Sequence, residues 1–319
     1  MKFHKAIFTS KSTINELPNS QTIFGAICSI LDQTQGDKML NEYIDSFGVS
    51  AKFVHSSMFL NKTFPMVKRN LFSLNDVNEM VKASTNDKKL GVLDLTKKYK
   101  KIRFVSQEIF KNYISEGKID NLKTDLLNNP DSFSLNNNVL SLKNEDILST
   151  VLANITTRNG FSENGVDKTL FYTTNIYYPK ETEFCIYIKD EVSVEYLENI
   201  FKYFEYFGLG NRRSIGMNCF QLKRIEEINL PSSKGNKLLL SRYIPDNDEI
   251  DFESSYYQLS SDIYRNSKAY TGGLVNGKYV HILEGSWLKT TEDKEYYGRI
   301  IETENNGKRV YHYAIGFLV

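Results

Sequence analysis

The sequence has few cysteines and no long apolar run, and each shortage excludes a class of protein. Its three cysteines, Cys28, Cys185 and Cys219, are too far apart in the sequence to form a zinc-binding CxxC pair. An odd number of scattered cysteines also argues against a disulfide scaffold. No stretch approaches the ~18 consecutive apolar residues of a transmembrane helix, so no membrane span is expected.

The chain also lacks a strong net charge and a secretion signal. Forty basic residues oppose 39 acidic ones, which leaves a net charge of +1. No global field would draw such a protein onto RNA, so a nucleic-acid site must be a local patch, and the isolated chain should bind RNA weakly. Residues 1–8 show neither a long apolar segment nor a cleavage site, and we expect a cytoplasmic protein without a membrane partner.

What the chain does have is apolar and aromatic material for a large core. Its 319 residues are 40% hydrophobic and include 20 Tyr and 20 Phe, enough for one large or two ordinary domains. Residues 2–9 and 52–60 have the composition of strands. Between them, Asn19 and Ser20 predict the start of a helix whose apolar face runs to Leu31, and Gly36 lies beyond its end.

A second ordered region begins near residue 169. Residues 170–178 and 183–189 are aromatic and β-branched and predict a hairpin around Pro179. Ser193 predicts the N-cap of one helix that ends at Gly208, and residues 217–228 predict a further strand. Strand, helix, strand, hairpin, helix and strand together indicate a split β-α-β-β-α-β unit with one spare strand, as in ferredoxin-like and RRM-like folds.

The predicted fold class is therefore α+β. We expect a ferredoxin-like domain at residues 1–230, interrupted by an insert at about 62–168 that contains short helices and a hairpin. Residues 231–235 have the composition of a linker. Residues 237–319 predict mostly short strands, so residues 231–319 are expected to form a second, partial domain of the same class.

The most informative segment is Gly208-Leu-Gly-Asn-Arg-Arg-Ser-Ile-Gly216. Its glycines permit positive φ and a close approach to a partner, and exposed N–H groups in such a loop form an anion site. Arg212 and Arg213 add guanidinium groups suited to phosphate, and Asn211 and Ser214 add neutral hydrogen bonds. The loop follows a helix and precedes a strand, which disfavours a dinucleotide fingerprint. It is either an RNA or phosphate site or only a helix cap and turn.

This loop resembles the signature of the RAMP superfamily of CRISPR proteins, G-[hydrophobic]-G-x-[KR]-R-S-x-G. Residues 18–26, Pro-Asn-Ser-Gln-Thr-Ile-Phe-Gly-Ala, resemble a stretch of the fourth subunit of the type III-A (Csm) effector complex. Weaker similarities follow in family order at residues 57–65, 158–172 and 284–287. The family usually has glycine where this chain has Asn211 and Asn218, and asparagine tolerates positive φ well enough for the loop to form.

The resemblance implies two ferredoxin-like units, an inserted thumb hairpin and a role without catalysis, cofactor or metal. Such subunits grip the repeat-derived 5′ tag of the guide RNA (crRNA), cap the complex, and dock the large palm-domain subunit beside the backbone RAMP subunits. Their thumb contacts the target RNA. The implied RNA contacts are the following residues: Gly208, Gly210, Asn211, Arg212, Arg213, Ser214, Gly216, Ser20, Gln21, Thr22, Arg158, Lys100 and Lys101.

The two lysines belong to a basic stretch. Residues 82–103 hold eight bases against two acids, Asp87 and Asp94. Within the family picture they are phosphate contacts, whereas by themselves they could equally form a solvated face.

Two other readings stay open. A guide-precursor-processing endoribonuclease of the same superfamily would use a histidine base, and the chain has His4, His55, His281 and His312, none at metal-ligand spacing. A structural protein without an RNA role would use the loop only as a turn. The acidic stretch from Asp246 to Glu253 is expected to be a solvated loop or a docking surface for a basic partner.

Overall fold

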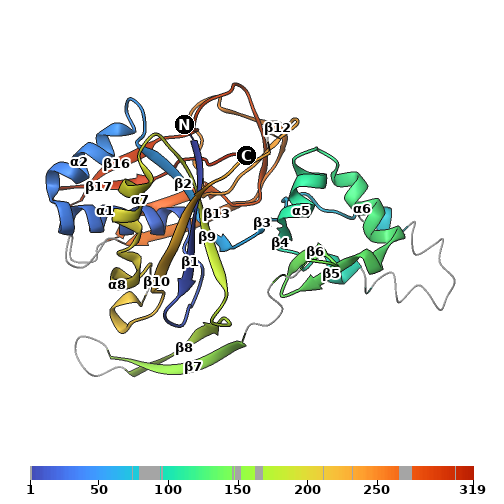
Figure 1. The fold of residues 1–319 in the computed structure, drawn as a ribbon, viewed down its shortest axis with the longest axis horizontal. Helices are drawn as coiled ribbons and strands as arrows, with labels where there is room; N and C mark the ends of the chain where they lie inside the picture. The colour runs from blue at the N-terminus through green and yellow to red at the C-terminus, as the bar shows by residue number, and fades with distance from the viewer. Residues whose placement is uncertain are drawn as a thin grey trace. The chain divides into compact units, whose positions relative to one another are not determined.

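The chain folds into two compact units in the computed structural model (Figure 1). Unit 1 comprises Met1–Asn61 and Leu148–Ile228, and unit 2 comprises Lys62–Ile147 and Asn229–Val319. In the part of the chain that the structure describes, every helix is too short or too polar to cross a membrane. The described residues are 2–73, 75–78, 94, 96–145, 147, 152–161, 168–210, 212–231, 233–265, 275–305 and 307–319.

Unit 1 is built on a four-stranded antiparallel sheet of order β10-β1-β9-β2. The strands are β1 (Lys2–Ser10), β2 (Phe53–Leu60), β9 (Glu183–Asp190) and β10 (Phe220–Glu227). One helix follows β1 and another lies between β9 and β10 in the chain, so the order is the predicted split β-α-β-β-α-β. The α+β class and its ferredoxin-like arrangement are confirmed.

The helices of unit 1 form where the sequence supplies caps and an apolar face. They are α1 (Ser20–Gln35), α2 (Asp37–Ser46), α7 (Val194–Phe201) and α8 (Phe204–Phe207). Aromatic rings join the helices to the sheet. Phe8 of β1 lies 6.0 Å from Phe201 and 5.8 Å from Phe204 between ring centroids, and Tyr43 stacks on Phe53 at 5.1 Å. Large rings of this kind dominate the stabilisation of a core.

The predicted hairpin between residues 170–178 and 183–189 is wrong. The first strand, β8 (Lys168–Tyr177), pairs instead with β7 (Leu152–Phe161), whereas β9 lies between β1 and β2. Five consecutive residues of β9 are buried, as a central strand requires, whereas β7 and β8 form a ribbon with exposed side chains. The β7–β8 pair is here called the thumb hairpin (Figure 1). Its strand β8 is the spare strand of the prediction, and β7 lies near the end of the predicted insert.

The predicted single helix from Ser193 to Gly208 is interrupted. Ser193 caps α7 as expected, its Oγ accepting from Tyr196 N at 3.2 Å. The helix ends at Phe201, and Tyr203 N then donates to Ile200 O at 3.2 Å before α8 begins. Gly208 ends α8 with a positive φ of +63°, as predicted, but its ψ of 162° lies outside the left-handed helical region expected for the cap.

The first half of unit 2 is a small mixed layer of strands and short helices. Its sheet has the order β3-β4-β6-β5, in which β4 and β6 are parallel. Phe64 stacks on Phe110 at 4.1 Å between ring centroids. Its elements are β3 (Thr63–Pro65), β4 (Phe104–Ser106), α5 (Gln107–Ile109), the π-helical turn η1 (Phe110–Ile114), α6 (Ile119–Asn128), the 3-10 turn η2 (Pro130–Ser132), β5 (Phe133–Asn136) and β6 (Val139–Leu142).

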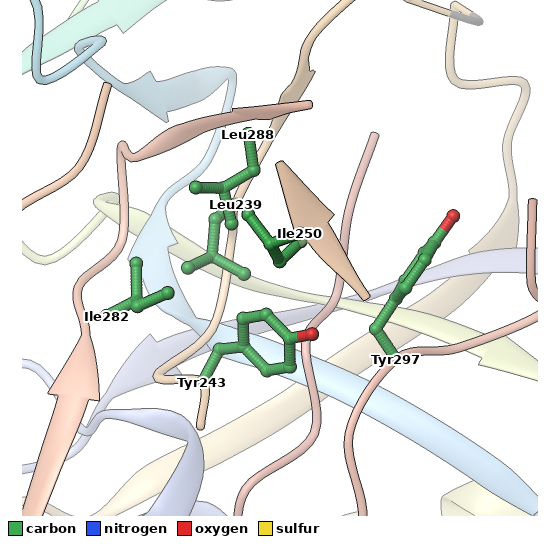
Figure 2. Close-up of a cluster of buried hydrophobic side chains, with 6 residues drawn as sticks. All are labelled: Leu239, Tyr243, Ile250, Ile282, Leu288 and Tyr297. Atoms are coloured by element: carbon green, nitrogen blue, oxygen red, sulfur yellow. The ribbon is translucent and has the colours of Figure 1, made fainter. Parts of the chain in front are cut away.

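The second half of unit 2 consists of short antiparallel strands around a buried apolar cluster (Figure 2). The cluster contains Leu239, Tyr243, Ile250, Ile282, Leu288 and Tyr297. The strands are β11 (Lys237–Leu238), β12 (Ile250–Tyr256), β13 (Leu259–Arg265), β14 (Val275–Ile282), β15 (Trp287–Thr290), β16 (Ile300–Asn305) and β17 (Lys308–Tyr313).

The stretch 284–287 meets the residues that directly follow the stretch 57–65, inside unit 2. Lys68 N donates to Gly285 O at 2.8 Å. Gly285 has φ +86°, and a Cβ atom built on it would lie 2.4 Å from Met66 O. The position therefore requires glycine, which explains a glycine between Glu284 and Ser286 in purely structural terms.

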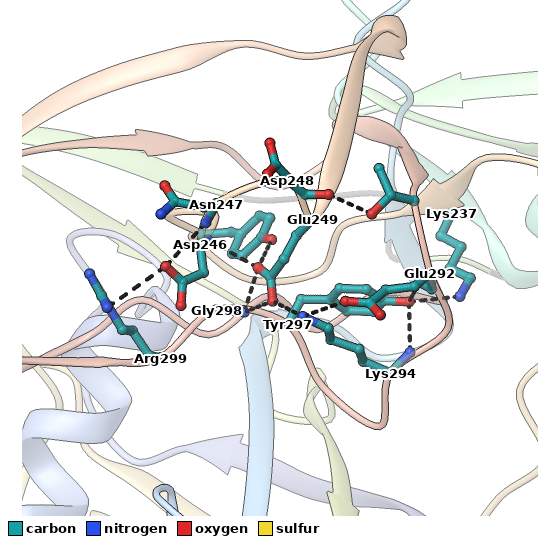
Figure 3. Close-up of polar contacts among 12 residues, drawn as sticks. Lys237, Asp246, Asn247, Asp248, Glu249, Glu292, Lys294, Tyr297, Gly298 and Arg299 are labelled. Carbon is teal, nitrogen blue, oxygen red and sulfur yellow. Dashed lines mark hydrogen bonds and ion pairs between the residues drawn. The ribbon is translucent and has the colours of Figure 1, made fainter.

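The expectation of a solvated or docking role for the whole acidic stretch from Asp246 is wrong for Glu249. This side chain is 3% exposed and lies at the centre of a polar network (Figure 3). It accepts from Tyr243 Oη at 2.6 Å, Gly298 N at 2.9 Å and Lys294 Nζ at 3.1 Å. Burial alone would raise the pKa of Glu249, but these hydrogen bonds outweigh it and lower the pKa on balance. Glu249 is thus a structural residue.

Candidate nucleic-acid interface

The glycine loop, residues 208–216, folds back tightly on itself. A Cβ atom built on Gly208 would lie 3.0 Å from Arg213 Cβ and 3.2 Å from Met217 O, so glycine is needed there. Gly210 and Gly216 also have positive φ, +78° each, and Arg212 adopts a left-handed conformation at +64°. Several N–H groups of the loop are used internally, because Ile215 N donates to Arg212 O at 3.1 Å and Gly216 N donates to Arg213 O at 3.0 Å.

Leu209 anchors the glycine loop to the core of unit 1. Its side chain is fully buried, and its backbone N donates to Asn218 O at 2.9 Å. Arg212 and Arg213 are half-buried, and Ile215 is exposed. Arg213 makes no ion pair with any acid in the described part of the chain. An anchored loop with a guanidinium that no carboxylate neutralises is suited to binding phosphate.

Asn218 behaves as the sequence predicts for an asparagine in place of glycine. It has φ +57°, and its side chain is buried. Its amide also makes bonds that glycine could not, because Nδ2 donates to Asn15 Oδ1 at 2.6 Å and Oδ1 accepts from Asn15 N at 3.0 Å. The corresponding expectation for Asn211 lies outside the described residues.

A connector, residues 11–19, ties the glycine loop to the rest of unit 1. Thr13 O accepts from Asn218 N at 3.0 Å, and Ser12 Oγ accepts from Cys219 N at 3.0 Å. Ile14 pairs with Ile176 at the base of the thumb hairpin through bonds of 3.0 and 2.6 Å. One short segment therefore holds the loop and the hairpin together. The sequence analysis missed this role, for which the only signal was a polar stretch between a strand and a helix.

The connector leads into the N-terminus of α1, which is fixed by side-chain caps. Asn19 Oδ1 accepts from Thr22 N at 3.0 Å, and Ser57 Oγ accepts from Ser20 N at 2.9 Å. Ser57 lies at an irregularity of β2 that also lets Met58 N donate to Pro18 O at 2.9 Å. The first turn carries no acidic residue, so its partial positive charge is not offset from within the helix.

The glycine loop and the start of α1 touch, although almost the whole of unit 1 separates them in sequence. A Cβ atom built on Gly210 would lie 3.0 Å from Thr22 Cγ2. Gln21 and Thr22 are half-buried, whereas the Ser20 side chain is fully buried. The structure thus brings together Thr22 and Gly210, two of the predicted RNA contacts, and places Ser20 beneath the surface.

The remaining predicted contacts lie elsewhere. Lys100 and Lys101 are exposed residues of unit 2. Arg158 lies in β7 opposite Phe171, but its side chain, like that of Ser214, is outside the described residues.

The thumb hairpin presents an apolar face. Cross-strand register places Ile155, Leu170 and Tyr172 on the same face, because directly opposed residues share a face and residues alternate along each strand. These side chains are 66%, 68% and 74% exposed, respectively. Leu152 and Tyr177, which pair on the opposite face, are 68% and 44% exposed. Exposed apolar groups in such a row usually mark an interaction surface. Residue types alone do not predict that these side chains are exposed.

The four histidines, the candidates for a general base, are buried. His4 Nδ1 lies 2.6 Å from Asp190 Oδ2, and both side chains are at most 5% exposed. Burial lowers the pKa of His55 to about 4. His281 Nε2 lies 2.7 Å from His312 Nε2, with both rings fully buried. No cluster of three or more metal-ligating side chains occurs in the described ranges. A base must reach its substrate, so this burial disfavours a histidine-dependent endoribonuclease.

Solved structures share the fold over its whole length, although the sequence matches no protein-family model and no curated protein. A chain of the Csm3–Csm4 subcomplex of a type III-A CRISPR-Cas interference complex aligns with a TM-score of 0.61 at 18% identity, over 100% of this chain and 98% of that one. Chains of the Csm1–Csm4 cassette with cA4 and with pppApA align at TM-scores of 0.57 and 0.56, with 15% and 14% identity. These alignments cover 99% and 100% of this chain and 97% of each of those.

This chain therefore shares the fold of a chain in each of these Csm assemblies. Csm4 is the component that these three assemblies have in common.

Proposed function

We propose that this protein is a non-catalytic RNA-binding subunit of a type III-A CRISPR effector complex, and that it grips the repeat-derived 5′ tag of the guide RNA. The observation that carries the proposal is the close approach of Gly210 to Thr22, which joins an anion-binding loop to the uncompensated N-terminus of a helix. Either element alone would be an ordinary turn or cap. Together they form one polar surface with a defined backbone shape.

Each part of this surface has a separate task. The guanidinium groups of Arg212 and Arg213 bind phosphates of the tag. Thr22, which lies against Gly210, and its neighbour Gln21 supply hydrogen bonds to ribose hydroxyls or base edges, which distinguish RNA conformation and sequence. Ser20 acts indirectly, because its backbone N–H donates a hydrogen bond to Ser57 Oγ and so fixes the first turn of α1.

The partners follow from the fold neighbours. Those neighbours come from assemblies of Csm4 with Csm3 and with Csm1. We propose that this chain likewise binds a backbone RAMP subunit and a large palm-domain subunit, and so caps one end of the complex. The thumb hairpin then lies against the target RNA, with Tyr172 available to stack on a base.

The test is retention of guide RNA by the assembled complex. The tagged protein is co-expressed with its partner subunits and a CRISPR array, and the 5′ ends of the co-purified RNA are sequenced. RNAs that share one repeat-derived 5′ tag, with the large subunit present, support the proposal. Arg212→Glu with Arg213→Glu should abolish their retention. The matched control reverses two exposed lysines of unit 1, Lys202→Glu with Lys223→Glu, and should retain them.

Equal retention by the folded arginine double variant would refute the role of the loop. An absence of RNA from the wild-type assembly would favour a purely structural subunit.

A further inference from the structure

Unit 2 contains a group of cations that the proposed grip on the guide tag does not use. The basic segment, residues 97–103, holds five of them in seven positions, and all five side chains are exposed. Within the described ranges, none of the five forms an ion pair, and neither does the neighbouring acid, Asp94. The five are Lys97, Lys98, Lys100, Lys101 and Arg103.

The basic segment is held so that its lysines face outward. Thr96 and Tyr99 are buried. Tyr99 Oη donates to Leu126 O at 3.1 Å, and its ring stacks on Phe72 at 5.8 Å between centroids. Residues 96–99 form a helical turn, with Lys100 N donating to Thr96 O at 3.0 Å. Because Thr96 and Tyr99 point inward on this turn, the lysines between and after them are directed to solvent.

Other lysines of unit 2 are neutralised by acids. Lys111 lies 3.6 Å from Glu108, and Lys123 lies 2.6 Å from Asp76. Lys118 and Lys234 lie 3.5 and 2.8 Å from Glu116. In a chain with almost equal numbers of acids and bases, a run of five cations without acidic partners is a local positive patch.

Further positive charge lies next to the patch. Burial lowers the pKa of Lys68, and the guanidinium group of Arg103 lowers it further, although Glu284 opposes this. The backbone of Arg103 is fixed on both sides, because its N donates to Asn138 O at 2.9 Å and its O accepts from Met66 N at 2.8 Å.

We propose that the basic segment is a second RNA contact that binds the phosphate backbone without reading sequence. The inference extends the proposed function, but it rests on charge and exposure in unit 2 rather than on the glycine loop. The five cations are too many to serve only as charge compensation for a helix dipole, because a helix C-terminus carries only about half a negative charge. A protein partner is also disfavoured, since protein interfaces are depleted in lysine and enriched in aromatic residues, whereas flexible ammonium groups suit a polyanion.

The experiment compares two variants of the full chain with the same change in net charge. The test variant carries Lys97→Gln, Lys98→Gln, Lys100→Gln and Lys101→Gln. The control variant carries Lys111→Gln, Lys118→Gln, Lys123→Gln and Lys234→Gln, the lysines that already have acidic partners. Binding of a labelled single-stranded RNA of mixed sequence is titrated from low to moderate salt, and thermal unfolding checks that each variant is folded.

The proposal predicts that the slope of log K against the logarithm of the salt concentration becomes less steep by about 3 in the test variant. Each phosphate contact to a single strand contributes ~0.7 to the slope, and four contacts are removed. Its affinity at low salt should fall by about tenfold or more, while the control stays close to wild type. Equal losses in both variants would mean that only net charge matters, and no loss in the test variant, or no RNA binding by the wild type, would overturn the inference.

An Arg212→Gln, Arg213→Gln variant in the same titration separates this inference from the proposed grip on the tag. A normal slope for the lysine variant with guide retention lost by the arginine variant would overturn the second contact alone. A reduced slope for the lysine variant, with guide retention unchanged in the arginine variant, would overturn the proposed binding of the tag by the glycine loop and support the second contact.

Discussion

The glycine loop of unit 1 and the basic segment of unit 2 are both positive surfaces, but they are built in different ways. The loop has two arginines on a backbone that glycines, a connector and a neighbouring helix fix in place. The basic segment has five cations on a short turn that two buried residues hold. A fixed backbone can select one RNA conformation, whereas mobile lysines bind any strand of phosphates. We therefore assign recognition of RNA conformation to the glycine loop and binding by charge alone to the basic segment.

The largest expected effect comes from changing the shape of the loop while its charge is kept. Gly210→Val places a branched side chain at φ +78° and against Thr22, and should cost about 3 kcal/mol, or about 100-fold in affinity for a tagged guide RNA. The salt slope that the basic segment contributes should not change. Filter binding of tagged and untagged RNAs measures both quantities.

Gly216→Val is the control for this change. Gly216 has the same φ of +78°, but nothing lies within 4 Å of a Cβ atom built there. If tag binding weakens equally in the two variants, backbone strain alone explains the loss. The contact between Gly210 and α1 then makes no contribution to tag binding. In a Gly210→Ala background, Thr22→Ser removes the opposing methyl group and should restore part of the affinity.

Acid should weaken the core of unit 2 without acting through either positive surface. Burial, together with Arg242, lowers the pKa of His281 to about 4, and burial together with His281 lowers that of His312 to about 3. The unfolded chain takes up these protons near pH ~6.5, well before the folded chain does. Stability is therefore complete above about pH 6.5 and falls as the pH drops toward about 4, on the order of 3 kcal/mol for each histidine.

Urea unfolding at a series of pH values measures this loss. His312→Phe keeps an aromatic ring against Tyr279, which stacks on His312 at 4.0 Å, and should flatten the pH dependence. A wild-type free energy of unfolding that stays constant between about pH 7 and 5 would contradict the expected linkage.

A smaller effect is expected where the loop meets the connector. Asn218→Ala removes the two bonds to Asn15 and leaves a Cβ-bearing residue at φ +57° without a polar side chain, which should cost about 2 kcal/mol of stability. Asn218→Gly loses the same bonds but no longer strains the backbone, so about half of that cost is expected. Chemical denaturation gives both values, and a glycine variant less stable than the alanine variant would show that φ at this position is unimportant.

The smallest effect is expected at the thumb hairpin. Tyr172→Ala should reduce affinity for target RNA by about 1 kcal/mol through the loss of one stacked base. Tyr177→Ala, on the opposite face of the same hairpin, is the control. Similar losses in both variants, measured by target-RNA binding to the guide-loaded complex, would show that stacking does not depend on the apolar face.

Local signals made much of unit 1 predictable. Asn19, Ser193 and Gly208 cap the helices as their residue types indicated, and the strands of the ferredoxin-like sheet lie where aromatic and β-branched residues gather. The partner of a strand is a long-range property, and so β8 was assigned to β9 although it pairs with β7. Residue types in 170–178 and 183–189 are similar, and only burial in the folded chain separates a central strand from a ribbon.

The candidate site was predictable as two segments but not as one surface. The glycines and arginines at 208–216 carry a recognisable pattern, yet nothing in the sequence says that Gly210 packs on Thr22. The role of the connector was hidden for the same reason, because its bonds run through backbone atoms that any residue possesses. Glu249 was misjudged because a buried carboxylate surrounded by donors has the same local sequence as a solvated one.

Crosslinking of the guide tag inside the assembled complex tests the central claim most directly. Photoreactive uridines are placed in the repeat-derived 5′ tag, the complex is irradiated, and the attached peptides are identified by mass spectrometry. The account predicts crosslinks to residues 208–217 and to the first turn of α1 in this chain. Tag nucleotides that crosslink only to other subunits, in a complex that contains this chain, would contradict it.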